Sequence, residues 1–343
     1  MRSLRLHGPR ELKMHDEPIP EPSPGEVQIQ VKSVGICASD LHYYRDGKIG
    51  TTKLTAPLVI GHEASGIVTA LGRGVTELQV GDRVAIEPAK PCMQCEYCAA
   101  GKYNVCPGIP FFGTPPTDGC LRDYITWPES LALKVPDSLS FDEIAMLEPF
   151  AVGAYAAELA DMNPDDTVVI LGAGAIGLST LQSAKMMGVK RVIVSEPLEA
   201  RRNLASELGA SDVIAPSNSE EEVNRLTSGR GADVVFECTG EENAVRESSR
   251  LAKVLGKVIV VGIPDGDDYS FDASAARRKQ LTAIFVRRSN LTTEKSIEWA
   301  AEGKIDIASY ATHRFPLENA QEAMELAINK SDGVIRAIIA VNE

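Results

Sequence analysis

Long hydrophobic runs, an excess of positive charge and internal repeats are all missing from this sequence of 343 residues. The longest apolar stretch, around residues 168–178, is too short and too rich in glycine to span a bilayer, and residues 1–20 lack the apolar segment of a secretory signal. The formal net charge is -13, with both signs interspersed, which disfavours binding to phosphate backbones and anionic lipid surfaces. We therefore expect a cytoplasmic protein without nucleic-acid or membrane partners.

The pattern of hydrophobic residues changes along the chain and predicts two domains, as the length also favours. Between residues 25 and 81, short bursts alternate polar and apolar residues, which predicts a β-rich domain with largely antiparallel strands. From residue 165 onward, buried-type strands alternate with helices such as 176–187 and 199–208, which predicts a doubly wound parallel sheet and hence an α/β fold class. The strands predicted for this sheet are residues 167–171, 191–194, 233–236, 257–261 and 281–285.

The tail after Arg288 has its own pattern of hydrophobic residues. It predicts a helix at 293–301, a short strand near Tyr310, a helix at 317–329 and a last strand at 334–341. We expect this tail to pack partly back onto the first domain.

A glycine-rich turn follows the first strand of the predicted parallel sheet. The segment Gly172-Ala173-Gly174-Ala175-Ile176-Gly177 fits G-x-G-x-x-G, in which glycines allow the tight turn and let backbone N–H groups approach a pyrophosphate. Glu196 stands at the end of the next strand, placed to accept hydrogen bonds from ribose hydroxyls and to repel a 2′-phosphate. This pattern predicts NAD rather than NADP. The alternatives are a glycine turn without a nucleotide, and a 2′-phosphate held by the nearby Arg201 and Arg202.

Four of the seven cysteines crowd into one short stretch, about residues 90–108. Four sulfurs at short gaps, in a chain without a secretory signal, match a closed structural zinc site. An iron–sulfur cluster or four incidental thiols are the alternatives. Cys120 and Cys238 lack partners at ligand spacing and are interpreted as buried thiols. The four predicted structural ligands are Cys92, Cys95, Cys98 and Cys106.

A second set of possible metal ligands is dispersed along the first half of the chain. It comprises Cys37, His62, Glu63 and Glu148. An open site of mixed thiolate, imidazole and carboxylate donors is what catalytic zinc needs. Taken singly, each residue also fits an ordinary structural role in a core or at a helix start.

Together these stretches resemble the zinc-containing medium-chain dehydrogenase/reductase family over essentially the whole chain. Gly61-His62-Glu63 with Gly66 and Gly72, followed by Gly81-Asp82-Arg83-Val84, is similar to the signature of the zinc alcohol dehydrogenases. Residues 37–44, 111–119 and 148–153 resemble the sorbitol/xylitol (polyol) dehydrogenases within that family. The resemblance implies a GroES-like catalytic domain at 1–148, a Rossmann NAD-binding domain at 149–288 and a C-terminal segment at 289–343 that returns to the catalytic domain, with the active site in the cleft between domains.

The resemblance also implies an activity, namely zinc-dependent hydride transfer between NAD and a secondary hydroxyl of a polyol of the sorbitol, xylitol or L-iditol type. It implies two zinc ions per subunit and a homotetramer, with a dimer second. Glu148 stands where the alcohol dehydrogenases have a cysteine ligand, so the choice between Glu63 and Glu148 as ligand stays open. Alternatives are a dehydrogenase for a simple alcohol, threonine, a sugar acid or a sugar phosphate, and an NAD-binding structural protein without catalysis.

Catalytic roles follow from the same resemblance. Ser39 and His42 match a hydroxyl-to-histidine proton relay, and Asp40 is expected to orient a ligand histidine, although such residues also cap local backbone. The expected substrate contacts are Tyr43, Phe112 (or Phe111), Glu148, Arg287 and Arg288. The expected cofactor contacts are Gly172, Gly174, Ile176, Gly177, Glu196, Arg201, Val261, Ile263, Val286 and Arg287.

Arg288 departs from the polyol pattern, which usually has an aromatic residue at this position. Two adjacent guanidinium groups are suited to gripping a carboxylate or phosphate, so an anionic sugar derivative is a second substrate hypothesis. The alternative is that Arg288 points to solvent or to the cofactor.

Overall fold

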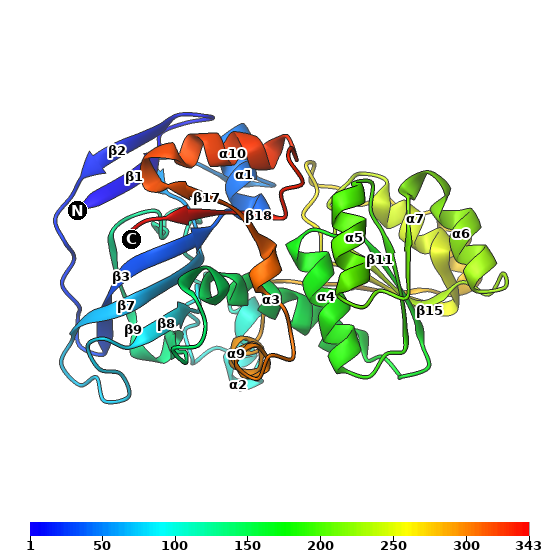
Figure 1. The fold of residues 1–343 in the computed structure, drawn as a ribbon, viewed down its shortest axis with the longest axis horizontal. Helices are drawn as coiled ribbons and strands as arrows, with labels where there is room; N and C mark the ends of the chain where they lie inside the picture. The colour runs from blue at the N-terminus through cyan, green and yellow to red at the C-terminus, as the bar shows by residue number, and fades with distance from the viewer. Residues whose placement is uncertain (343) are drawn as a thin grey trace. The chain divides into compact units, whose positions relative to one another are not determined.

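The computed structural model describes residues 1–342 and divides the chain into two compact units (Figure 1). The first unit comprises Met1–Glu148 and the segment from Thr293 onward, and the second comprises Pro149–Thr292. The boundary falls inside the long helix α3 (Phe141–Ala160), immediately before Pro149. None of the helices within residues 1–342 has the length and apolar character needed to cross a membrane.

The first unit is built around a seven-stranded sheet in the order β10-β8-β7-β3-β18-β17, with β9 also paired to β3. The antiparallel strands predicted from alternation are confirmed, since β3 runs antiparallel to β7, β9 and β18. In β3, Val27, Ile29 and Val31 are fully buried while the residues between them are half-buried, as alternation requires. The elements of this part are β1 (Arg2–Leu6), β2 (Leu12–Asp16), β3 (Glu26–Gly35), α1 (Ala38–Asp46), β4 (Lys48–Ile49), β5 (Thr52–Lys53), β6 (Leu58–Val59), β7 (Glu63–Leu71), β8 (Arg83–Ile86), α2 (Glu96–Ala99), β9 (Tyr124–Pro128) and β10 (Ala132–Lys134).

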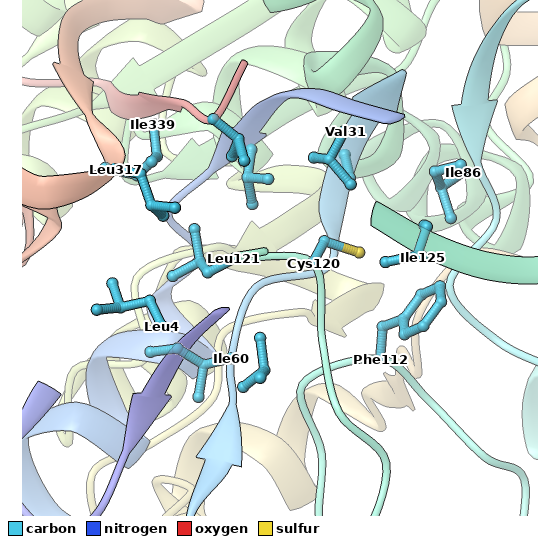
Figure 2. Close-up of a cluster of buried hydrophobic side chains, with 14 of the residues drawn as sticks. Leu4, Val31, Ile60, Ile86, Phe112, Cys120, Leu121, Ile125, Leu317 and Ile339 are labelled. Carbon is cyan, nitrogen blue, oxygen red and sulfur yellow. The ribbon is translucent and has the colours of Figure 1, made fainter. Parts of the chain in front are cut away.

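The C-terminal tail completes this sheet and its core. Strand β18 (Arg336–Ala340) pairs with β3 on one side and with β17 (Ala311–Pro316) on the other. Figure 2 shows Leu317 and Ile339 of the tail in the same cluster as Leu4, Ile60 and Leu121 from the N-terminal part. Because full burial of each such side chain contributes about 1.5–3 kcal/mol, the tail is an integral part of this unit's stability.

The short strand predicted near Tyr310 is confirmed as β17, which begins at Ala311 directly after a 3₁₀ helix (Ala308–Tyr310). One helix of the tail differs from the sequence prediction. The helix predicted from Leu317 starts as a 3₁₀ turn after Pro316, whose extended backbone delays the α-helix to α10 (Ala320–Ile328). The helix α9 (Thr293–Ala301) matches its prediction.

The second unit contains a six-stranded, wholly parallel sheet in the order β13-β12-β11-β14-β15-β16. All five predicted strands form in it, and the predicted α/β class is confirmed. The chain runs outward from β11 on one side and then returns to its other side at β14, so the switch point lies between β11 and β14. The elements are β11 (Thr167–Leu171), α4 (Ala175–Met186), β12 (Arg191–Ser195), α5 (Glu199–Glu207), β13 (Asp212–Ile214), α6 (Ser219–Leu226), β14 (Ala232–Glu237), α7 (Ala244–Leu251), β15 (Ala252–Val260), α8 (Ala273–Lys279) and β16 (Thr282–Phe285).

Candidate active site and metal centres

Three chemically different donors meet where β3 ends and β7 begins. Cys37 follows β3 by two residues, and Glu63 opens β7 opposite Gly35 of β3. The candidate ligand atoms of Cys37, His62 and Glu63 lie within 4.8 Å of one another. His62 is 5% exposed and Glu63 is fully buried. The sheet register therefore brings the thiol of Cys37 next to the imidazole and carboxylate of the consecutive residues His62 and Glu63.

Gly35 leaves the room that this cluster needs. A Cβ atom at Gly35 would collide with a carboxylate oxygen of Glu63 and would lie 2.6 Å from Cε of Met146. Any larger residue at this position would therefore displace the Glu63 carboxylate from the cluster.

Asp40 holds both ligand-bearing segments in place. Its Oδ2 accepts a hydrogen bond of 3.0 Å from the backbone N–H of Cys37, and its Oδ1 accepts one of 2.9 Å from Gly61. The same Oδ1 lies 3.6 Å from Nδ1 of His62. One buried carboxylate thereby fixes the backbone before His62 and the orientation of its ring, as outer-shell partners of ligand histidines do.

The cluster is rich in buried groups whose protonation is perturbed. Burial alone would lower the pKa of His62, but Asp40 and Cys37 outweigh this effect and raise it well above its usual value. Burial raises the pKa of Glu63, and burial raises that of Glu148 to about 8, with the Glu63 carboxylate adding to the effect. Oε2 of Glu63 has no hydrogen-bond partner within residues 1–342, while Oε1 forms an ion pair with Arg336. Buried donors of this kind, with unused acceptor capacity, fit a divalent zinc ion.

Arg336 belongs to this site although the sequence reasoning did not include it. Its guanidinium is 8% exposed, lies 3.0 Å from Oε1 of Glu63 and donates a 2.9 Å hydrogen bond to the carbonyl oxygen of Ile36. The pairing of β18 with β3 brings it there. The available signal was one arginine in an otherwise apolar last strand, because a charge in a strand buried on both faces needs a partner.

Four other candidate residues of the first unit lie on two helices. Glu148, on α3, is 8% exposed and lies outside the three-residue cluster, although its pKa responds to His62 and Glu63. Helix α1 begins directly after Cys37 and carries Ser39, His42 and Tyr43. His42 and Tyr43 are buried, and Ser39 is half-buried.

The structure separates the two aromatic candidates for substrate contact. Phe112 is 2% exposed, and its ring packs on Trp127 with centroids 3.9 Å apart, inside the cluster of Figure 2. The ring centroid of Phe111 lies 5.1 Å from that of His62. Phe112 thus packs in the hydrophobic core and Phe111, 8% exposed, packs near His62, and both stay candidates for substrate contact.

The four-cysteine lobe is assembled locally. Cys92, Cys95, Cys98 and Cys106 bring their sulfurs within 4.8 Å of one another, and none of the cysteines forms a disulfide. The sulfurs of Cys95 and Cys106 are 3.9 Å apart, close to the roughly 3.8 Å between two thiolates that share a tetrahedral zinc at about 2.3 Å. Backbone N–H groups of Gln94 and Cys95 lower the pKa of Cys92 to about 6, which favours its thiolate form. The donor set fits a closed zinc site.

In the second unit, the glycine-rich turn connects β11 to α4 and is tied to Glu196. A Cβ atom at Gly177 would collide with the carbonyl oxygen of Gly172, so the helix can approach the turn only with glycine there. Glu196 is 3% exposed, and its Oε2 accepts a 2.8 Å hydrogen bond from the N–H of Ala173. The other candidate cofactor residues near this turn are Gly174, Ile176 and Arg201, the last with Nη1 3.9 Å from where a Cβ on Gly174 would lie.

The two arginines after Glu196 differ in their contacts. Arg202 donates 2.7 Å hydrogen bonds to the carbonyl oxygens of Glu196 and Pro197, so its guanidinium is engaged by the chain itself.

Four further candidates follow the carboxyl ends of β15 and β16, the edge of a parallel sheet at which ligands bind. These are Val261, Ile263, Val286 and Arg287, and Arg288 comes next with a left-handed backbone (φ 56°).

Comparison with known proteins covers both units. Residues 23–137 match the alcohol dehydrogenase GroES-like domain, and residues 175–302 match the zinc-binding dehydrogenase family. The chain is 35% identical to sorbitol dehydrogenase of Bacillus subtilis, over 100% of this chain and 98% of the relative. It is also 35% identical to L-idonate 5-dehydrogenase of Vitis vinifera, over 96% and 92% of the two chains. The structure of an alcohol dehydrogenase from Escherichia coli complexed with NADH superimposes with a TM-score of 0.89, at 29% identity over 99% of both chains.

The fold and these matches define a zinc-dependent oxidoreductase. The chain belongs to the zinc-containing medium-chain dehydrogenase/reductase family and lies among the relatives of the polyol dehydrogenases, which confirms the resemblance drawn from sequence.

Proposed function

We propose that this protein oxidises a secondary hydroxyl of a polyol with NAD, or catalyses the reverse reduction. The observation that carries the proposal is the buried cluster of Cys37, His62 and Glu63, whose mixed donors suit an open catalytic zinc site. The four-cysteine lobe supplies a second, structural zinc site, and the turn from Gly172 to Gly177 with Glu196 supplies the dinucleotide site. We expect a polyol of the sorbitol, xylitol or L-iditol type, and the name of the relative from Bacillus subtilis, sorbitol dehydrogenase, supports this class.

Each group has a distinct task in the proposed reaction. Zinc, when bound, supplies a Lewis acid that polarises the substrate hydroxyl, and NAD supplies the hydride acceptor. Cys37, His62 and Glu63 hold the metal, while Asp40 orients His62 and Arg336 compensates the charge of Glu63. Glu148 contacts water or substrate, since its raised pKa lets it exchange a proton near neutral pH.

The proton from the hydroxyl leaves through Ser39 and His42, which follow Cys37 on helix α1. His42→Ala is expected to lower kcat about a hundredfold at neutral pH and to remove the acidic limb of the pH–rate profile. Steady-state kinetics across pH measure both effects. Full activity along the acidic limb in this variant would exclude the relay.

NAD is preferred over NADP in this proposal because of Glu196, which stands where it repels a 2′-phosphate and is fixed by the Ala173 N–H. The engagement of Arg202 by backbone carbonyls supports the same preference. Turnover at equal concentrations of NAD and NADP measures it, and faster turnover with NADP would contradict it.

A second candidate substrate class is an acidic sugar, favoured by the adjacent Arg287 and Arg288. To decide between a neutral and an acidic substrate, kcat/KM is measured with sorbitol and with L-idonate, in the wild type and in Arg288→Ala. If the neutral polyol is the substrate, sorbitol turns over faster and the substitution leaves the ratio unchanged. A preference for L-idonate that Arg288→Ala abolishes would assign the pocket to the anion.

We further propose that the protein is cytoplasmic and assembles as a homotetramer, with a dimer as the alternative. Strand β16 lies at the edge of the parallel sheet, and Phe285 on it is 54% exposed. An exposed edge strand with large apolar side chains is suited to pairing with a second copy. Sedimentation of a monomer at assay concentrations would contradict the assembly.

A further inference from the structure

One buried carboxyl group in the second unit has no role in the reaction described so far. Glu237 ends β14 and is fully buried. Its Oε1 accepts three hydrogen bonds, from the N–H of Thr239 at 2.6 Å, from the Thr239 hydroxyl at 2.7 Å and from the N–H of Gly240 at 2.9 Å. Its Oε2 has no hydrogen-bond partner within residues 1–342. A buried carboxyl oxygen without a partner costs free energy, so its presence needs a physical reason.

The turn held by Oε1 packs against the glycine-rich turn. The methyl carbon Cγ2 of Thr239 lies 2.8 Å from the position that a Cβ on Gly172 would take, so the two segments are in direct contact. Glu237 accepts hydrogen bonds from both the N–H and the hydroxyl of Thr239 and thereby orients the side chain that contacts Gly172.

The same turn packs on its other side against the segment after β15. A Cβ on Gly240 would collide with the carbonyl oxygen of Ile263, and a Cβ on Gly262 would lie 2.6 Å from Oε2 of Glu237. The main-chain oxygen of Glu237 also accepts hydrogen bonds from the N–H groups of Val261 at 2.8 Å and Gly262 at 3.0 Å. One residue therefore holds two segments, through its side chain and its main chain.

We propose that Glu237 is a positioning residue for the bound dinucleotide. It sets the spacing between the turn that receives the pyrophosphate and the Val261–Ile263 segment, which contains two of the expected cofactor contacts. We place this segment at the nicotinamide end, because β15 lies on the other side of β11 from β12 and Glu196. This inference rests on the proposed NAD site. A ligand that occupies only the adenosine end does not span the two segments and is insensitive to their spacing.

The test compares NADH with AMP as ligands of the zinc-loaded protein. In Glu237→Gln an amide replaces the carboxylate. The amide is a weaker acceptor for the three donors, and its NH₂ group replaces one carboxylate oxygen. We expect the Kd of NADH, measured by fluorescence titration, to rise about tenfold. The Kd of AMP, measured by calorimetry, is expected to change less than about twofold.

The matched control is Asp233→Asn. Asp233 is a buried carboxylate at the opposite end of the same strand, paired with Arg230 and Lys253. This control is expected to lower the melting temperature. The Kd of NADH divided by the Kd of AMP should stay at its wild-type value. If Glu237→Gln weakens both ligands equally, or neither, the positioning role is overturned.

Thr239→Val provides a second variant if Glu237→Gln fails to fold. It removes the hydroxyl donor to Glu237 and keeps a methyl group toward Gly172, so a rise of about threefold in the Kd of NADH alone is expected. An unchanged NADH affinity would overturn the role. A wild-type protein that binds AMP but not NADH, or neither, would overturn the proposed NAD site itself, which separates the two failures.

Discussion

The two candidate metal sites of the first unit are built in opposite ways. The four cysteines of the lobe lie within one short stretch, and two of them, Cys92 and Cys95, are exposed or half-buried. Cys37 comes from one segment and the consecutive residues His62 and Glu63 from another. The register of β3 and β7 brings the two segments together beside a buried arginine from the last strand. A closed set of four thiolates suits a structural ion, while three mixed donors leave a coordination position for substrate.

Because the two sites are built differently, we expect the loss of each to affect a different property of the protein. A local lobe that folds around its ion contributes to stability and can be lost without altering the chemistry elsewhere. The dispersed site depends on the pairing of β3 with β7 and, in the proposed function, carries the chemistry. Substitutions in and around the two sites separate a loss of activity from a loss of stability.

His62→Ala removes one ligand of the dispersed site. We expect kcat/KM for the polyol to fall about a thousandfold or more, because the Lewis acid is lost or misplaced, and zinc to fall from two ions to one per subunit. Kinetics with elemental analysis measure both. His15→Ala, a half-buried histidine of the N-terminal hairpin, is the control and keeps both values. Two retained zinc ions in His62→Ala would contradict the assignment.

Cys98→Ser removes a buried ligand of the lobe. The expected result is one zinc per subunit and a melting temperature lower by about 10 °C, because a structural zinc contributes directly to folding. Activity per folded molecule stays within about twofold, since the dispersed site is intact. Cys120→Ser, a buried non-ligand thiol, keeps two zinc ions. If Cys98→Ser lost activity per folded molecule while its melting temperature stayed unchanged, the roles of the two sites would be reversed.

Arg336→Met leaves Glu63 buried without its cation. We expect a loss of about 3–5 kcal/mol in the free energy of unfolding, the range for breaking a buried pair by removing one partner. The control is Arg314→Met on the neighbouring strand β17, whose pair with Asp142 is half exposed and contributes about 0–1 kcal/mol. Denaturant titration measures both. Equal losses in the two variants would show that Arg336 is not coupled to the site.

Glu148→Gln changes the pH dependence of stability. Burial raises the pKa of Glu148 from its ordinary 4.5 to about 8, so the folded protein retains a proton that the unfolded chain has released. The contribution of this group is therefore complete below about pH 4.5 and is lost as the pH rises through about 8. In zinc-depleted protein, the melting temperature of Glu148→Gln should fall less over this range than that of wild type. Parallel curves for the two proteins would contradict the raised pKa.

Local patterns in the sequence predicted most of the fold and the local parts of the sites. The parallel strands are continuous apolar runs, and the glycine turn and the cysteine lobe are complete within a few residues, so spacing alone identifies them. Cys37, His62 and Glu63 came together only through the family resemblance, because sheet register is not a property of any one segment.

The features that sequence could not supply depend on long-range pairing. Arg336 reaches Glu63 only because β18 pairs with β3, and no motif surrounds it. The different neighbours of two adjacent rings, Trp127 for Phe112 and His62 for Phe111, likewise depend on tertiary packing. Tyr310 and Leu317 entered 3₁₀ turns at element ends, where hydrophobic periodicity carries little information.

Zinc-dependent oxidation of a polyol is tested by the rate of NAD reduction with sorbitol, xylitol and L-iditol before zinc chelation, after it and after zinc is restored. We expect turnover of a neutral polyol that chelation abolishes and that zinc, but not magnesium, restores. A rate that survives the loss of both zinc ions, or no turnover of any polyol by protein with two zinc ions per subunit, would contradict it.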